Sequence, residues 1–260
     1  MRMETRCIMM LPWTGRYAPL FGFGDPIPLP GEFTAARLLR LRPGAGARLA
    51  GLLLLPALAI PGNDYQSLLQ RLNGWVPNNA VLNEYLTTVQ QLLEQVIQIN
   101  LNEKKLDTGL NGLFRNLVLS TAWQESCWRQ FVEEQGQIRP IGSHAGAIGI
   151  MQVNQHVWRG FYDVDSLKQD VGYNARAGSE ILHHYLVDYA IAKGEHTLNG
   201  GEDNLAHATY AMYNGGPRQM KRYREAKTPK SLRRIDESFW KKYQTVSAGN
   251  VLGVAECYTN

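Results

Sequence analysis

The sequence predicts a mainly α-helical fold with a small β element, and three observations support this prediction. Beyond residue 60, apolar residues recur at three- and four-residue spacing in several long segments, which is the period of an amphipathic helix. One glycine-rich segment between them has the composition of turns and a short hairpin. The chain shows no alternation of strand and helix patterns, which would predict a parallel sheet, and no internal repeat.

The predicted elements follow one another along the chain. We expect helices at residues 81–99, from Gly112 into the segment 121–128, at 177–194 and at 202–216. Gly194 is a plausible stop for the third of these, and Pro217 can start the next helix. The last helix is marked by Leu232, Ile235, Phe239, Tyr243 and Val246. Turns and a small hairpin are expected at 142–154. We divide this part of the chain into an N-terminal helical segment, residues 63–109, and a domain formed by residues 110–260.

The composition indicates a globular protein. Hydrophobic residues make up 44% of the 260 residues and charged residues 19%, unlike a disordered chain. This length suits one sizeable domain, or a domain with a small appendage. The net charge of +4 favours weak attraction to anions but lacks the concentrated basicity of a nucleic-acid binder, so we expect no nucleic-acid partner.

Residues 1–62 have a different composition from the rest of the chain. Four arginines, at positions 37, 40, 42 and 48, precede the apolar run 49–60, which contains the small-x-small pattern Ala57-Leu58-Ala59 of a signal-peptidase site. The run is shorter than the ~20 residues of a membrane span. We therefore predict an export signal region or poorly structured leader, a true start downstream of Met1, and a protein of the periplasm or cell envelope with no stable membrane span after processing. A Leu-rich packing segment remains the alternative.

The segment TAWQESCW, residues 121–128, contains a glutamate among apolar neighbours. On a helix, residues seven and eleven apart almost eclipse each other, so Phe114, Val118 and Glu125 lie on one line. Burial raises the pKa of a carboxyl group, which is what a general acid at neutral pH requires. The alternative is a carboxylate that reaches water or pairs with Arg129, four residues further on.

Four segments follow one another along the chain: Glu125-Ser126, Gly149-Ile150-Met151-Gln152, the YNARAG segment with Asn174 and Gly178, and Tyr213-Asn214-Gly215-Gly216. Together they resemble the catalytic domain of soluble lytic transglycosylases, whose fold is related to goose-type lysozyme. The resemblance covers roughly residues 110–225 and implies a lysozyme-like helical domain. Two departures from the family's pattern concern the groove. The stretch 127–145 is longer than is usual in the family, and Met212 stands where the family commonly has Ala.

The resemblance implies cleavage of the β-1,4 bond between N-acetylmuramic acid and N-acetylglucosamine in peptidoglycan, with formation of 1,6-anhydromuramoyl ends. Glu125 would be the general acid and base, and the implied substrate-binding residues are Ser126, Met151, Gln152, Tyr213 and Asn214. Structural alternatives stay open for these: Ser126 can bond to its own helix, Met151 can pack under the groove, Tyr213 can pack in the core or at the rim, and Asn214 can cap a turn.

Other side chains have local explanations. Asp163, Asp165 and Asp170 could serve a hydrolytic variant but suit turns and N-caps better. Several aromatic residues could stack on sugars, although core packing is the commoner role: Trp123, Trp128, Trp158 and Tyr162. We expect no metal or cofactor, because the histidines lack companions at ligand spacing: His183, His184 and His207. The basic run 218–234 suits a solvated helix face or attraction to an anionic cell wall.

The cysteines fit an exported protein. Removal of the leader would remove Cys7 and leave Cys127 and Cys257, for which we predict a disulfide; two unpaired buried thiols are the alternative. We expect a monomer whose partner is the peptidoglycan glycan strand. Two rival functions remain at this stage: a lysozyme-like muramidase that uses water, and a non-catalytic envelope component that binds glycan.

Overall fold

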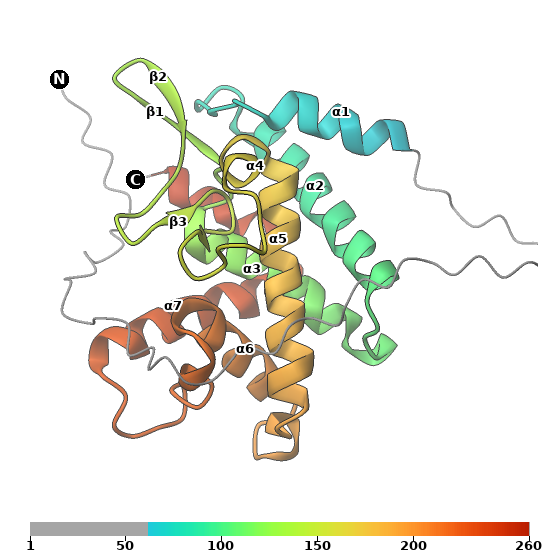
Figure 1. Ribbon diagram of the computed structural model, residues 1–260, viewed down its shortest axis with the longest axis vertical. Helices are drawn as coiled ribbons and strands as arrows, with labels where there is room; N and C mark the ends of the chain where they lie inside the picture. Colours follow the sequence, from blue (N-terminus) through green and yellow to red (C-terminus); the bar gives the residue numbers. More distant parts are fainter. Residues whose placement is uncertain (1–61, 260) are drawn as a thin grey trace, which may run out of the picture. The chain divides into compact units, whose positions relative to one another are not determined.

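The computed structural model describes residues 62–259 (Figure 1), so the predicted leader lies almost entirely outside the described residues. The α-helices are α1 (Gly62–Leu72), α2 (Leu82–Glu103), α3 (Asn111–Ser126), α4 (Val164–Gln169), α5 (Val171–His184), α6 (Asp203–Gly215) and α7 (Lys230–Ser247). Short helices are η1 (Thr108–Leu110), η3 (Glu195–Thr197), η4 (Pro217–Gln219) and η5 (Val251–Tyr258), and η2 (Tyr185–Ile191) is a π-helix. The predicted fold class, mainly α with a small β element, is confirmed.

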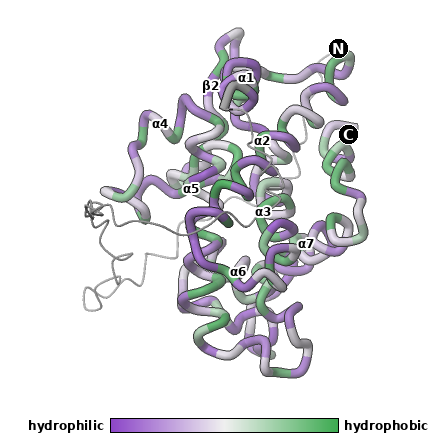
Figure 2. Tube along the Cα trace, turned by 90° about the vertical axis from the view of Figure 1, so that its right-hand side faces the viewer, coloured by the Kyte–Doolittle hydropathy of each residue, from purple (hydrophilic) through white to green (hydrophobic). Residues whose placement is uncertain are grey.

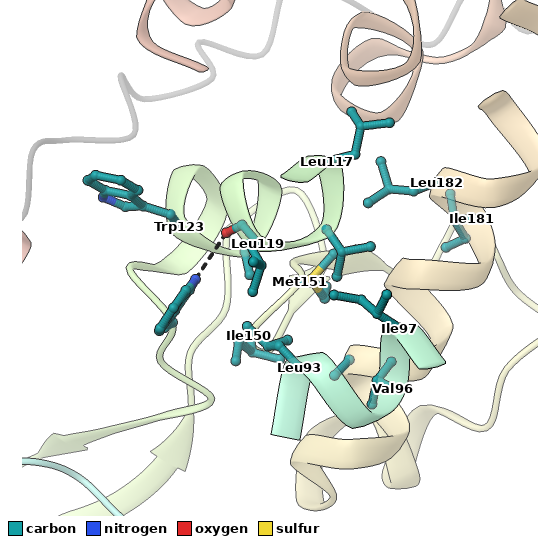
Figure 3. Packing of buried hydrophobic residues seen from close by; sticks show 14 of the residues in the cluster. Leu93, Val96, Ile97, Leu117, Leu119, Trp123, Ile150, Met151, Ile181 and Leu182 are labelled. Atoms are coloured by element: carbon teal, nitrogen blue, oxygen red, sulfur yellow. Dashed lines mark hydrogen bonds between the residues drawn. The ribbon is translucent and has the colours of Figure 1, made fainter. Parts of the chain in front are cut away.

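The hydrophobic core forms where α2, α3 and α5 pack against one another, with α6 and α7 against α3. Figure 3 shows side chains that meet in this core: Leu93, Val96 and Ile97 of α2, Leu117 and Leu119 of α3, Ile150 and Met151 of the glycine-rich segment, and Ile181 and Leu182 of α5. The predicted amphipathic helices supply most of these residues, and hydrophobic and hydrophilic positions alternate along them (Figure 2). Because α3 packs against helices on several sides, its last turn is held firmly.

Two antiparallel hairpins make up the β structure within the described residues. The small hairpin predicted in 142–154 is confirmed: β3 (Ala147–Ile148) pairs with β4 (Val153–Asn154). A second hairpin was not predicted; its strands are β1 (Phe131–Glu134) and β2 (Gln137–Pro140). Its two-residue turn has positive φ at both Gln135 (53°) and Gly136 (75°), the conformation that favours a tight hairpin turn. The unusually long stretch 127–145 therefore contains this hairpin.

The C-terminus is linked to the end of α3. A disulfide joins Cys127 to Cys257, with Cα atoms 6.0 Å apart, and this is the pairing that the sequence predicted. Beside it, the Tyr258 hydroxyl donates a hydrogen bond of 2.7 Å to the Cys127 carbonyl oxygen. The segment η5 is thus fixed next to the helix end that carries Glu125. None of the described helices combines the length and the apolar character that crossing a membrane requires.

Candidate active site

Glu125 lies in the last turn of α3, and the helix ends at the next residue, Ser126. Phe114 and Val118, eleven and seven residues earlier on the same line, are completely buried, as the helical spacing predicted. Cys127 adopts a left-handed conformation (φ 55°), and its N–H donates to the Trp123 carbonyl oxygen at 3.0 Å. Glu125 therefore continues the core-facing side of α3 and lies at the C-terminal end of that helix.

The carboxyl group of Glu125 is half-buried and has one hydrogen bond within the described residues. The Tyr210 hydroxyl donates to Glu125 Oε1 at 2.9 Å. Loss of hydration on burial raises the pKa of Glu125 to about 7 from an ordinary 4.5, although the Tyr210 hydrogen bond and the positive charges of Lys242 and Arg222 act in the opposite direction. A group with this pKa can both donate and accept a proton near neutral pH.

Tyr210 is the site residue that the sequence analysis missed. Its ring stacks on Phe239 of α7 with centroids 3.8 Å apart and planes within 4°. This contact fixes the ring, so the hydroxyl has a defined position beside the carboxyl group. Tyr210 precedes the motif tyrosine, Tyr213, by three residues, and only the packing of α6 against α3 and α7 decides which hydroxyl reaches Glu125.

The glycine-rich segment 149–152 lies against α3 and is held by two buried amide side chains. The Ile150 N–H donates to Gln130 Oε1 at 2.8 Å, and the Met151 N–H donates to Asn174 Oδ1 at 2.9 Å. Gly149 has a φ of 76°, and a Cβ there would come within 2.4 Å of both amide groups. This close approach explains why a glycine opens the segment, and it shows that Asn174 acts structurally.

Gly178 and Ser126 complete the attachment of this segment. A Cβ at Gly178 on α5 would lie 2.4 Å from the Met151 Cβ, so the glycine allows Met151 to pack against the helix. The Ser126 hydroxyl donates to the Ile150 carbonyl oxygen at 2.6 Å and to the Ala122 carbonyl oxygen at 3.1 Å. Ser126 is buried, and these bonds tie the end of α3 to the segment.

The other predicted binding residues occupy different positions around the segment. The Tyr213 hydroxyl donates to the Met151 carbonyl oxygen at 2.6 Å, whereas the hydroxyl that bonds to Glu125 belongs to Tyr210. The Gln152 amide donates to the Gly149 carbonyl oxygen at 2.9 Å, while its buried Oε1 has no partner within the described residues. Asn214 is exposed near the end of α6.

The aromatic residues fall into two groups. Trp123 and Trp128 are buried, and the Trp128 indole N–H donates to the Leu119 carbonyl oxygen at 3.0 Å, the dashed contact in Figure 3. Trp158, in contrast, is half-buried and makes edge contacts with Tyr162 and Tyr185 at 6.3 and 6.1 Å between centroids. Burial raises the pKa of Tyr213, and the neighbouring Glu125, Tyr162 and Tyr185 raise it further, which places this second group on the Tyr213 side of the site.

Several remaining expectations concern residues outside the site. Asp163 and Asp170 are N-caps: they accept N–H groups of Ser166 (2.7 Å) and Gly172 (2.8 Å), as predicted. Met212, which stands where Ala is common in the family, is fully buried in the core. Arg129, the alternative partner of Glu125, donates from Nε to the Ser126 carbonyl oxygen at 3.2 Å.

Across residues 62–259, no three His, Cys, Asp or Glu side chains come together as metal ligands. A cavity of about 410 Å³ opens between η1, η2, η3 and the start of α6, where Leu110, Val187 and His196 are among its lining residues. It shares no residue with the Glu125 site.

The fold and the site together define a lysozyme-like helical domain with a half-buried acid at the end of a central helix. Residues 108–234, just under half of the chain, match the model of the family described as Transglycosylase SLT domain. The resemblance to the catalytic domain of lytic transglycosylases is thereby confirmed for this part of the chain, with peptidoglycan as the substrate that the family implies. No curated protein and no solved structure matches the chain.

Proposed function

We propose that the protein is a peptidoglycan lytic transglycosylase that cleaves the β-1,4 bond between N-acetylmuramic acid and N-acetylglucosamine and forms 1,6-anhydromuramoyl ends. The observation that carries this proposal is the environment of Glu125. Its carboxyl group is half-buried, is bonded to Tyr210, and has a pKa raised by burial to about 7. Near neutral pH, such a group is protonated often enough to act as an acid and ionised often enough to act as a base.

In this reaction, Glu125 donates its proton to the departing glycosidic oxygen. The carboxylate that remains then accepts a proton from the C6 hydroxyl of the muramoyl residue, and this hydroxyl attacks the anomeric carbon in place of water. One carboxyl group suffices if the substrate's own N-acetyl group stabilises the positive sugar centre, unlike the common two-carboxylate scheme. In support, burial raises the pKa of Glu125, a tyrosine and two cations lower it, and no second carboxylate is bonded to it within residues 62–259.

The surrounding residues would hold the glycan. Gln152 Oε1, which lacks a partner within the described residues, is an acceptor suited to an N-acetyl N–H, and the exposed Asn214 amide suits sugar hydroxyls. Met151 and Ser126 would shape the segment from beneath, because both are buried. Trp158 and Tyr162 offer partly exposed aromatic rings against which a sugar could pack. We further propose export to the periplasm or cell envelope, which mass spectrometry of the mature N-terminus would test.

Mass analysis of muropeptides released from purified sacculi tests the reaction. We expect wild-type protein to release anhydromuramoyl products and Glu125→Gln to be slower by roughly 10²–10⁴-fold, the usual contribution of general acid–base catalysis. Glu237→Gln, which changes an exposed glutamate of α7, is the matched control and should keep full activity. Release of reducing, hydrated ends alone would establish a hydrolase that uses water.

Two other outcomes would contradict the proposal more deeply. If Glu125→Gln digests sacculi at the wild-type rate, Glu125 is not the acid. If neither protein releases muropeptides although both sediment with sacculi, the domain binds glycan without cleaving it.

A further inference from the structure

Helix α7 contributes to the site from beyond the matched domain. The family match ends at residue 234, whereas α7 continues to Ser247. Phe239, in this continuation, carries the ring on which Tyr210 stacks. Lys242 lies three residues further along and therefore on nearly the same side of the helix. The part of α7 beyond the matched domain thus brings both an aromatic support and a cation toward the end of α3.

The ammonium group of Lys242 is held against the residues that immediately precede Glu125. Its Nζ donates to Gln124 Oε1 at 2.5 Å and to Ser238 Oγ at 3.0 Å, and it lies 6.0 Å from the ring centroid of Trp123. The side chain is half-buried, and no carboxylate of residues 62–259 forms an ion pair with it. Neutral groups therefore fix the position of this charge without cancelling it.

The other cation near Glu125 is in a different situation. Arg222 binds both carboxylate oxygens of Asp236 at 2.7 to 3.1 Å, and both residues are buried. Most of the field of Arg222 is cancelled by this bidentate pair. Among the charged groups that act on Glu125, Lys242 is thus the cation with no bonded anion.

We propose that Lys242 is a positioning residue of the reaction: its fixed ammonium group favours the carboxylate form of Glu125, so that the glutamate can act as a base after it has acted as an acid. This inference rests on the function proposed above. In a dehydrated site without a nearby cation, donation of the proton to the leaving group's oxygen would leave an unstable carboxylate. A cation held nearby lowers that cost without forming an ion pair that would trap the carboxylate.

The electrostatics of both partners agree with this geometry. Burial raises the pKa of Glu125, whereas the Tyr210 hydrogen bond, Lys242 and Arg222 lower it. Burial lowers the pKa of Lys242, while Glu125 and, from η5, Glu256 raise it. The remaining titratable groups that face Glu125 are the hydroxyls of Tyr210 and Tyr213 on α6, whose pKa values burial raises, so they stay neutral.

The test is the titration of Glu125 in folded protein. The ¹³C signal of its side-chain carboxyl group, assigned by its loss in Glu125→Gln, is followed against pH in wild type, Lys242→Met, Lys242→Gln and Lys242→Arg. We expect the midpoint to move to higher pH by about half a unit or more when the charge is removed and to stay near the wild-type value in Lys242→Arg. Lys241→Met, which removes an exposed charge from the neighbouring position, is the control and should not move it.

The same variants are then compared in the digestion of sacculi. The pH at which the rate is half-maximal should move with the titration midpoint in Lys242→Met and Lys242→Gln. An unchanged midpoint in a folded charge-removal variant would overturn the proposal and leave Lys242 as a bridge between α3 and α7. Lys242→Gln retains a polar group for Gln124 and Ser238, so a folding defect confined to Lys242→Met still leaves a decisive variant. The titration needs no substrate, so an inactive wild type would refute the proposed function and not the effect of Lys242 on Glu125.

Discussion

Glu125 and Glu195 are both withheld from bulk water, but their surroundings differ. Glu195, in η3, is 2% exposed, and it accepts hydrogen bonds from Arg224 Nη2 at 2.8 Å and from the Tyr223 hydroxyl at 2.9 Å. Glu125 is more exposed, and the described residues give it one hydrogen bond, from Tyr210. The bonded Arg224 compensates the charge of Glu195, whereas the cations near Glu125, Lys242 and Arg222, do not bond to it.

The comparison shows that burial alone does not identify a catalytic carboxyl group. A carboxylate with a set of charge-assisted bonds serves to join two segments of the chain. A carboxyl group with few bonds can change its protonation state at little cost. The incomplete compensation of Glu125 is therefore the property that suits it to proton transfer, and the following predictions test this difference.

Glu125→Gln should raise the stability of the protein at high pH. The pKa of Glu125 is about 7 in the folded protein and 4.5 as an ordinary value, so the folded state binds this proton more tightly. The resulting stabilisation is complete below pH 4.5 and is lost as the pH rises through 7. At roughly 1.4 kcal/mol per pH unit, the loss in wild type amounts to about 3 kcal/mol by pH 8, and the variant does not suffer it.

Urea unfolding of both proteins at pH 4.5 and at pH 8 measures this effect. The free energies of unfolding should be similar at the lower pH and should favour the variant at the higher pH. Equal stabilities at pH 8 would show that Glu125 ionises as easily when folded as when unfolded, which contradicts the prediction.

Glu195→Gln should have the opposite effect. The amide keeps the shape of the side chain but loses the negative charge that accepts from Arg224 and Tyr223, which leaves part of a buried bonding site unsatisfied. We expect a loss of about 2 kcal/mol in the free energy of unfolding, since hydrogen bonds to charged groups contribute ~1.5–3 kcal/mol. Digestion of sacculi by the folded variant should stay at the wild-type rate. A stabilised Glu195→Gln would contradict the structural role assigned to this glutamate.

Much of the fold, but less of the site, could be predicted from the sequence. The helical period located α2, α3, α6 and α7, because each presents a continuous apolar stripe to the core. The β1–β2 hairpin lacks such a signal, since most of its residues are exposed and no alternation of apolar and polar residues develops. The segment predicted as one helix over 177–194 is α5 followed by the π-helix η2, a change of hydrogen-bond register that leaves the apolar spacing nearly intact.

At the site, the sequence identified the residues near the glutamate but not their contacts. Glu125 was found because it continues a buried stripe. Tyr210, Gln130 and Lys242 act through contacts with residues that are 20 to 118 positions away, and no local pattern encodes such contacts. Tyr210 and Tyr213 lie one helical turn apart and look alike in the sequence, and the packing of α6 and α7 alone selects the hydroxyl that bonds to the acid.

Tyr210→Phe should weaken activity by about tenfold, or about 1.4 kcal/mol, which is close to the lower end of the contribution of one hydrogen bond to a charged group. The variant keeps the ring that stacks on Phe239 but removes the bond that favours the carboxylate of Glu125, so the pKa of Glu125 should rise and the pH–rate profile should move to higher pH. Tyr213→Phe is the matched control on the same helix, because it removes a hydroxyl that bonds to the Met151 carbonyl oxygen. The pH–rate profile of Tyr213→Phe should keep its position even if the rate falls. A shift of the profile in Tyr213→Phe and none in Tyr210→Phe would mean that the hydroxyl controlling the protonation of Glu125 is that of Tyr213. The bond to Tyr210 would then not be what distinguishes Glu125 from Glu195.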